Sequence, residues 1–460
     1  MKQKLELNRG FWINILGVAL PIAMQNLITM ATSMMDSIML GRADDTGVLL
    51  SAATLANQPF FILSLVTFGL GGAASVLCAQ YWGRGELSPV RALFSIILKV
   101  AFVVGALFGA AVLLFPTLIL SLYTPRAELI EAGASYLRII GFAYMIFAVS
   151  NTAVCTLRGI ELVLVSVVSG VASFVTNVFL NWVLIFGHLG APALGIRGAA
   201  LATLTARVLE FVIVMTYLFG VDRRLRLRPR DFMRFNRVLA GDLFRTGTLV
   251  VLNELCWSVT MSVQAAILGH VTYASGDPVA ANSIASILQQ LSTTFIFGFA
   301  GAAAVLVGKA IGEGDREKAV RRAHTFQLTS FLLGLLACGF ILLIREPFIG
   351  LYDIPAATRT LARELVSVTA VVTIFVSMAT TMIVGILRGA GDVRFCMVIE
   401  AGLLWLLATP AAFLAAMVFR WPVPVVLLCM KLDEPTKTLA CCLRMRDDRW
   451  VTNVTRDGME

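Results

Sequence analysis

Long apolar stretches recur along the whole chain, and short polar segments separate them. A helix needs about 20 mostly apolar residues to cross the hydrocarbon core of a bilayer. The pattern therefore predicts an all-α polytopic membrane protein with twelve transmembrane helices. The predicted spans are residues 11–40, 52–82, 92–122, 130–157, 163–187, 194–220, 239–269, 279–311, 323–344, 360–387, 395–419 and 421–442. The last has the shortest apolar run, which ends at Met430 before charged residues follow.

Composition agrees with this pattern. Hydrophobic residues make up 58% of the 460 residues and charged residues 14%, whereas a soluble domain carries about 25% charged residues. The net charge of +9 would suggest a nucleic-acid partner in a soluble protein. Here the Lys and Arg gather in alternate loops when the N-terminus is placed inside, as the positive-inside rule requires. We therefore expect a multi-pass protein of the plasma (inner) membrane, with both termini cytoplasmic, the lipid bilayer around it and no nucleic-acid partner.

The largest basic block, residues 222–237, contains seven Arg and two Asp. It is typical of a cytoplasmic loop that sets the topology and touches anionic lipid head groups. The eight Cys show neither metal-site nor disulfide spacing, so we expect no metal and no cofactor. The first apolar run is too long for a cleavable signal peptide and lacks a small-residue cleavage site.

The chain matches itself when it is shifted by roughly half its length. The matched segments, in order along the chain, are LGR 40–42 with LGH 268–270, FGLGGAASVL 68–77 with FGFAGAAAVL 297–306, GRGE 83–86 with GEGD 312–315, LY 122–123 with LY 351–352, and LRG 157–159 with LRG 387–389. Five matches in order at nearly constant offset indicate an internal duplication, which also supports the twelfth span.

Each half then contains six spans, an even number, so both halves start on the same side of the membrane. The predicted organisation is an N-terminal lobe (1–221), a cytoplasmic basic loop (222–237), a C-terminal lobe (238–442) and a cytoplasmic tail (443–460). Two six-helix lobes related by a parallel repeat are typical of carriers, which bind substrate between the halves and rock them. One chain supplies both lobes, so we expect it to work as a monomer.

Asp36 is the first candidate for chemistry, because it is the only charged residue between Phe11 and Leu40. A lipid-exposed carboxyl would cost several kcal/mol, so we expect it to face protein or a watery cavity. There it can bind a proton, Na⁺ or a cationic substrate. The alternative is a residue that caps the helix end or meets Arg42. Pro21 favours function, because a proline inside a helix removes a backbone hydrogen bond and allows a bend.

Glu254 is the other isolated acid well inside a span, and the offset that aligns LGR 40–42 with LGH 268–270 makes Asn26 its counterpart. The alternative to a functional role is an acid hydrogen-bonded to Asn253 and the backbone. Glu400 lies about two turns from the cytoplasmic end of its helix, where it can reach the interface, so we expect no role for it.

Amides and hydroxyls add to these acids. Asn177 and Asn181 are four residues apart, so both face one way, and Thr203 supplies a hydroxyl in the next span. Such groups suit a hard cation or a proton relay, although ordinary interhelical hydrogen bonding explains them as well. Arg207 with Glu210, and Lys431 with Glu434, are each three residues apart. We expect both to be structural ion pairs rather than proton relays.

These residues and motifs resemble the multidrug and toxic compound extrusion (MATE) family of secondary transporters over essentially the full length. The resemblance rests on DSIMLGR, GRGE with GEGD, NVFLNWVLIFG, GIRGAALAT, the two LRG motifs and WVTNVTR. It implies twelve helices in two lobes, a central cleft, and export of organic cations driven by inward H⁺ or Na⁺.

The resemblance also implies coupling residues. One branch of the family uses an N-lobe cluster of Asp, Asn, Asp and Thr, which falls here on Asp36, Asn177, Asn181 and Thr203, so the second acid is an amide. A sodium-coupled branch uses a glutamate that falls on Glu254. Its other acid would fall near Ser377, where this chain has none. The coupling ion therefore stays open. Polar residues within spans that we expect to line the substrate cleft are Gln58, Trp257, Gln264, Asn282 and Gln289.

The nearest alternative function is a flippase for lipid-linked saccharides of the same wider superfamily. It would need several cationic side chains for a pyrophosphate, and few lie deep in the first-lobe helices. An intramembrane enzyme would need a nucleophile with a base, or clustered metal ligands. His188, His270 and His324 fall near span ends without suitable partners, so we expect no enzyme. The acids and the duplication do not favour a channel or receptor.

Overall fold

The computed structural model describes residues 5–6, 8–44, 46–228, 231, 236–272, 274–352 and 354–456. Every regular element among these residues is helical, which confirms the predicted all-α class. Part of the predicted basic loop 222–237, namely residues 229, 230 and 232–235, lies outside the described residues, as do residues 457–460 of the predicted tail.

The first half of the chain forms helices that follow the predicted spans closely. They are α1 (Arg9–Ala43), α2 (Val48–Ala56), α3 (Gln58–Gly83), α4 (Leu87–Leu114), α5 (Pro116–Ser121), α6 (Ala127–Arg158), α7 (Leu164–Phe186), the 3₁₀ turn η1 (His188–Gly190), α8 (Ile196–Thr216) and the π-helical η2 (Tyr217–Val221). The predicted second span is two helices, because Asn57 separates α2 from α3. The predicted third span is also two helices, because Phe115 separates α4 from α5.

The second half repeats this plan with more irregular helices. They are α9 (Arg237–Gly269), α10 (Pro278–Gly312), α11 (Arg316–Ile349), α12 (Ala356–Thr380), η4 (Thr381–Leu387), α13 (Val393–Leu403), η5 (Leu404–Ala408), α14 (Thr409–Phe413), η6 (Leu414–Val418), α15 (Val423–Met430), α16 (Asp433–Arg444) and the short 3₁₀ η7 (Asp448–Trp450). Three of these segments, η4, η5 and η6, are π-helical. Such segments are rare and often mark functional positions.

Eleven helices among the described residues are long and apolar enough to cross a membrane. The last predicted span, 421–442, is not one continuous helix, because α15 ends at Met430 and α16 begins at Asp433. Gln264 donates from Nε2 to the Met430 carbonyl oxygen at 3.2 Å. A break at membrane depth is tolerated when the freed backbone groups find partners in the protein, and Gln264 supplies one.

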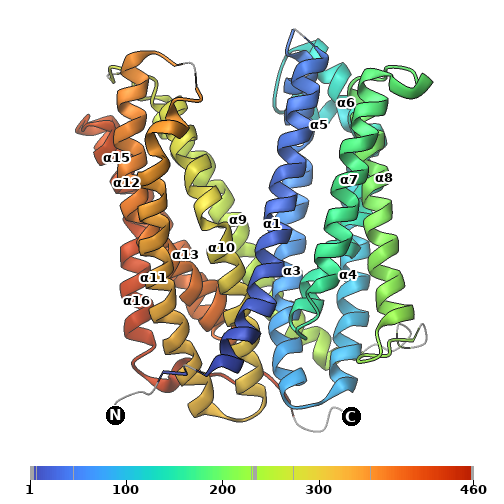
Figure 1. Ribbon diagram of the computed structural model, residues 1–460, viewed down its shortest axis with the longest axis vertical. Helices are drawn as coiled ribbons and strands as arrows, with labels where there is room; N and C mark the ends of the chain where they lie inside the picture. Colours follow the sequence, from blue (N-terminus) through green and yellow to red (C-terminus); the bar gives the residue numbers. More distant parts are fainter. Residues whose placement is uncertain are drawn as a thin grey trace. The chain divides into compact units, whose positions relative to one another are not determined.

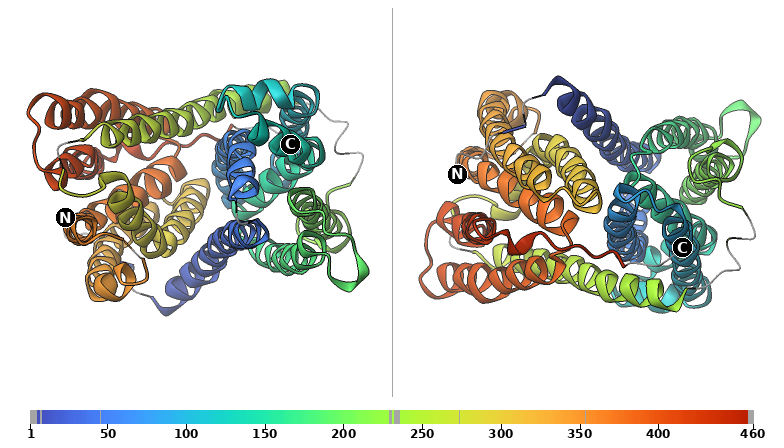
Figure 2. Two further views of the ribbon diagram at one scale, coloured as in Figure 1. Left: turned by 90° about the horizontal axis from the view of Figure 1, so that it is seen from above. Right: turned by 90° about the horizontal axis from the view of Figure 1, so that it is seen from below.

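The chain divides into two compact units. The N unit contains residues 24–78 and 85–251, and the C unit contains the described residues up to Ala23 together with 79–84 and 252–456. The helices α1, α3 and α9 therefore contribute to both units. Within each unit the long helices run alongside one another (Figure 1), and the end-on views show them gathered as a bundle (Figure 2). The predicted domain boundaries stay predictions.

Each unit has its own apolar core. In the N unit, Leu63, Leu120, Leu137 and Tyr144 are fully buried together. In the C unit, the fully buried core residues include Leu288, Ile341, Leu365 and Val426. Lipid is as apolar as these side chains, so close packing rather than exclusion from water holds membrane helices together.

One helix pair shows how that packing repeats along the chain. In the N unit α4 meets α6 at Gly105, where a Cβ would lie 2.7 Å from both Met145 Cα and Ala148 Cβ. In the C unit α11 meets α12 at Gly334, where a Cβ would lie 2.9 Å from Ile374 Cα and 3.1 Å from Ser377 Cβ. All three C-unit positions follow their N-unit counterparts at one and the same offset along the chain. The duplication seen in the sequence is therefore also a duplication of helix packing.

Candidate functional site

A chain of hydrogen bonds joins three helices inside the N unit. Asn181 Nδ2 on α7 donates to Asp36 Oδ1 on α1 at 2.5 Å and to Asn177 Oδ1 at 3.1 Å. Asn177 Nδ2 donates in turn to Thr203 Oγ1 on α8 at 3.2 Å. The i, i+4 spacing on α7 puts both amides on one face, as predicted. The structure thus brings together four of the residues named from sequence, and Asp36 meets an amide rather than capping its helix.

Among the described residues, this chain of hydrogen bonds contains one amide oxygen that accepts no hydrogen bond. Asn177 and Asn181 are 1% and 0% exposed, and the Asn181 Oδ1 atom is buried without a hydrogen-bond partner among the described residues. A buried amide oxygen that accepts no hydrogen bond costs about 1–3 kcal/mol. It lies on the same amide as the nitrogen that faces Asp36. This oxygen lies where a proton donor or a cation beside the carboxylate could be accepted.

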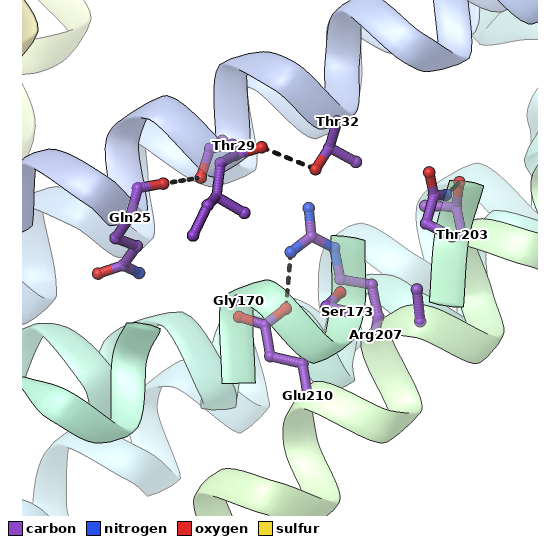
Figure 3. A pocket seen from close by; sticks show the side chains of 11 residues that line it. Gln25, Thr29, Thr32, Gly170, Ser173, Thr203, Arg207 and Glu210 are labelled. Carbon is purple, nitrogen blue, oxygen red and sulfur yellow. Dashed lines mark hydrogen bonds and ion pairs between the residues drawn. The ribbon is translucent and has the colours of Figure 1, made fainter. Parts of the chain in front are cut away.

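A polar cavity lies next to this chain in the same unit (Figure 3). Asn177 and Thr203 belong to both the cavity wall and the hydrogen-bonded chain. The other polar residues that line it are Gln25, Thr29 and Thr32 from α1, Ser173 from α7, and Arg207 and Glu210 from α8. Polar groups from three helices converge on one space, which is the usual character of a binding site.

Arg207 and Glu210 form the ion pair that their spacing predicts. Arg207 Nη1 lies 2.7 Å from Glu210 Oε2, with side chains 19% and 10% exposed. The pair stands in the cavity wall opposite Thr29 and Thr32 (Figure 3). Its partnership reduces the cost of holding two charges in the membrane region.

Arg158, from the first LRG motif, was not assigned a role from sequence. Its Nη2 donates to the side-chain oxygen of Gln25 and so ties the end of α6 to α1. The repeat of the LRG motif could have pointed to it, because a charged residue that recurs at the same place in both halves needs a partner in each.

The corresponding arginine in the C unit has two carboxylate partners. Arg388 Nη1 lies 2.9 Å from Glu254 Oε1, and Arg388 Nη2 lies 3.3 Å from Glu400 Oε2. Asn253 Nδ2 donates to the same Glu400 oxygen at 2.5 Å. Glu254 is therefore not isolated, and Asn253 serves Glu400 rather than Glu254. The expectation that Glu400 simply reaches the interface is wrong, because a long-range ion pair holds it.

These contacts also correct the repeat alignment. Arg158 of the first LRG motif meets Gln25, and Arg388 of the second meets Glu254. The structural counterpart of Glu254 is therefore Gln25, and Asn26, the counterpart assigned from sequence, is the next residue along the helix. Equivalent helix positions face equivalent partners. A shift of one residue rotates the side chain by about 100° around the helix axis, so it faces a different neighbour.

A second charged cluster of the C unit also differs from expectation. Lys431 lies in the break between α15 and α16. Lys437 is the cation that holds the acids there, with its Nζ 2.5 Å from Asp433 Oδ2 and 3.7 Å from Glu434 Oε1. Sequence reasoning paired Glu434 with Lys431 because it assumed one continuous helix.

The five predicted cleft residues are divided between the units, with Gln58 in the N unit and the others in the C unit. Gln264 bonds the Met430 carbonyl, and Gln289 Nε2 donates to Thr373 Oγ1 at 3.2 Å. Trp257 is 38% exposed and Asn282 is half-buried. Their role in a cleft stays a prediction. Among the described residues, no group of three His, Cys, Asp or Glu side chains could hold a metal ion.

Long apolar helices, internal duplication and buried polar networks define a polytopic membrane transporter. The comparison with known proteins is specific: the MatE family model matches residues 21–183 and 250–414, so the chain belongs to this family of transporters. The resemblance found in the sequence is thereby confirmed, and the protein is not an enzyme.

Named relatives and solved structures agree. The chain is 26% identical over 419 residues to the probable multidrug resistance protein NorM of Thermotoga maritima, covering 88% of this chain and 86% of the relative. It is 27% identical over 418 residues to the multidrug resistance protein PmpM of Pseudomonas aeruginosa, covering 89% and 86%. An outward-facing multidrug resistance MATE transporter of the MOP superfamily superposes with a TM-score of 0.84 at 19% identity, over 98% and 100% of the two chains. The MATE-like fold is therefore confirmed.

Proposed function

We propose that this protein is a secondary active antiporter that exports lipophilic organic cations in exchange for H⁺ or Na⁺ by alternating access. It acts as a monomer in the plasma membrane with both termini in the cytoplasm, and the coupling ion is the only cofactor it needs. The relatives named as multidrug resistance proteins support the export of drug-like molecules. The observation that carries the proposal is the hydrogen-bonded chain from Asp36 through Asn181 and Asn177 to Thr203.

This chain of hydrogen bonds suits ion exchange because, among the described residues, the hydrogen-bond partner of Asp36 is a neutral amide. A carboxylate held by an arginine or lysine already has its counter-ion, whereas Asp36 receives a hydrogen bond from an amide. In a low-dielectric environment, binding a proton or a cation strongly stabilises such a carboxylate. Asp36 can therefore load and unload an ion.

Coupling requires that loading be worth more in one conformation than in the other, since equal affinity shifts no equilibrium. The hydrogen-bonded chain joins α1, α7 and α8. An ion bound at Asp36 therefore affects how these three helices pack. We propose that the loaded and unloaded sites favour different arrangements of these helices. The exported cation then binds best to the arrangement that the other ion disfavours.

The test uses purified protein in proteoliposomes loaded with ethidium, with a pH gradient and a Na⁺ gradient imposed separately. We expect one gradient to drive ethidium movement in the wild type and Asp36→Asn to abolish it. Glu131→Gln is the matched control, because Glu131 is an exposed acid on α6 and its substitution removes the same charge. Wild-type rates from Asp36→Asn would refute the assignment of Asp36.

The same transport experiment also distinguishes an antiporter from a saccharide flippase. A flippase would need free cationic side chains for a pyrophosphate, but in the N unit Arg158 bonds Gln25 and Arg207 bonds Glu210. Transport of the dye by neither gradient would overturn the antiporter and favour the flippase.

A further inference from the structure

The Arg207 guanidinium is held by a carboxylate and two aromatic rings. Glu210 Oε2 lies 2.7 Å from Arg207 Nη1. The guanidinium carbon also lies 4.9 Å from the ring centre of Phe147 and 5.7 Å from that of Phe60. A carboxylate with aromatic faces is the combination that binds organic cations, because charge and ring quadrupole both attract them. The N unit therefore contains a cation site, and its own arginine occupies it.

This site opens on the polar cavity. Arg207 and Glu210 both line the cavity, together with Thr29, Thr32 and Ser173. The two charged side chains keep 19% and 10% of their surface exposed, so a molecule in the cavity can reach them. Water in the cavity screens an ion pair that faces it, so the attraction between Arg207 and Glu210 is weaker there than inside the protein.

We propose that Glu210 binds the positively charged group of the transported organic cation and that Arg207 is a tethered competitor for this carboxylate. When the ligand enters, it replaces the guanidinium on Glu210. Arg207 loses one partner but keeps the faces of Phe147 and Phe60, so its displacement costs less than the loss of a lone ion pair. When the ligand leaves, Arg207 returns and Glu210 is not left uncompensated. This inference rests on the proposed export of organic cations and names the residues that recognise them.

Charge balance links this exchange to Asp36. The ligand adds a second positive charge to a cavity that already contains the Arg207 guanidinium, and Glu210 can neutralise one of them. Asp36 is the nearby second carboxylate: Arg207 lies within electrostatic reach of it, and Thr203 and Asn177 connect it to the cavity wall. Asp36 without its coupling ion balances the extra charge, whereas loaded Asp36 does not. Cation binding and ion loading therefore oppose one another, as an antiporter requires.

The experiment measures the affinity of the purified full-length protein for tetraphenylphosphonium in detergent at one fixed pH, by equilibrium dialysis. We expect Arg207→Met to bind it about tenfold more tightly, since Glu210 loses its competitor. We expect Glu210→Gln to bind it about tenfold more weakly, since the carboxylate is gone and Arg207 remains. Arg207→Lys keeps a competing cation but loses the stacked guanidinium, so its affinity should lie between those of the wild type and Arg207→Met. The exposed-site control Glu131→Gln should stay within about threefold of the wild type.

The opposite signs distinguish the proposal from a structural ion pair. If the pair only stabilised the fold, both single variants would melt earlier and leave the dissociation constant of the folded fraction unchanged, which would overturn the proposal. Should Arg207→Met fail to fold, Glu210→Gln decides alone, because wild-type affinity there refutes the role of Glu210. A wild-type protein that neither binds nor moves any organic cation would refute the proposed function as well. Wild-type binding with unshifted variants would refute only this inference.

Discussion

The arginine in the middle of each LRG motif has different partners in the two units. In the N unit Arg158 bonds the neutral side chain of Gln25, whereas in the C unit Arg388 holds Glu254 and Glu400. Both halves descend from one duplicated unit, so the difference arose afterwards. At this position it has left the C unit with two carboxylate partners and the N unit with one amide partner.

The acids of the two units differ in the same way. In the C unit Glu254 and Glu400 share Arg388, and Asp433 and Glu434 share Lys437. In the N unit Asp36 has an amide partner and lies on a chain that reaches a cavity. A carboxylate with a counter-ion can take up another cation only by displacing that partner, while one with a neutral partner is directly available to a mobile ion. The comparison therefore supports the proposal that ion exchange occurs in the N unit.

No acid of the C unit corresponds to Asp36. The offsets that relate LGR 40–42 to LGH 268–270 and GRGE 83–86 to GEGD 312–315 place Gln264 and Ala265 opposite it. Gln264 bonds the carbonyl at the break between α15 and α16. The same region of the helix thus carries a carboxyl facing amides in one unit and an amide that repairs the backbone in the other.

The largest difference between the two units is expected in transport. Asp36→Asn should abolish gradient-driven ethidium transport, whereas Glu254→Gln should lower it by no more than about fivefold, because Glu400 continues to neutralise Arg388 and only one partner is lost. Initial rates in proteoliposomes under the active gradient measure both. Complete loss in Glu254→Gln with a wild-type melting temperature would show that the C unit also exchanges ions.

A smaller but still large difference is expected in stability. Arg388→Met leaves two half-buried carboxylates without this cation and should cost about 3 kcal/mol, the lower end of the range for a broken buried pair. Arg158→Met leaves only the Gln25 oxygen without a charged donor and should cost about 1.5–3 kcal/mol. Thermal unfolding of the two purified variants in the same detergent gives the comparison. Equal melting temperatures would mean that the carboxylates of the C unit do not depend on their arginine.

The smallest expected effect is a loss of stability that should be the same in both units. Gly105→Ala and Gly334→Ala each introduce a Cβ at a helix contact that has no room for it. Each substitution should destabilise the protein by about 1–3 kcal/mol, the usual cost of overpacking. Their melting temperatures should fall together, by similar amounts, with Gly17→Ala as the control because a Cβ there meets nothing within 4 Å. A fall in only one variant would show that the duplicated helix pairs no longer pack alike.

Much of the N-unit site was predictable from the chain. The i, i+4 spacing of Asn177 and Asn181 is a local property of a helix, and it predicted their shared face. Asp36 stood out as a single charge in a long apolar run. In contrast, the partner of Glu254 was missed, because Arg388 lies 134 residues further along the chain. Periodicity within one helix says nothing about which residue of another helix it meets.

The amino-acid sequence by itself determined the membrane class, the helical spans, the duplication and the acids that needed an explanation. Each of these depends on hydrophobicity and spacing along a single segment, which the bilayer translates directly into helices. Only the tertiary structure decided which charges are neutralised: Asp36 faces amides, Arg388 holds two glutamates, and Lys437 rather than Lys431 holds the acids of α16. The physical reason is that the energy of a buried charge depends on atoms within about 4 Å, and helix packing brings those atoms from distant parts of the chain.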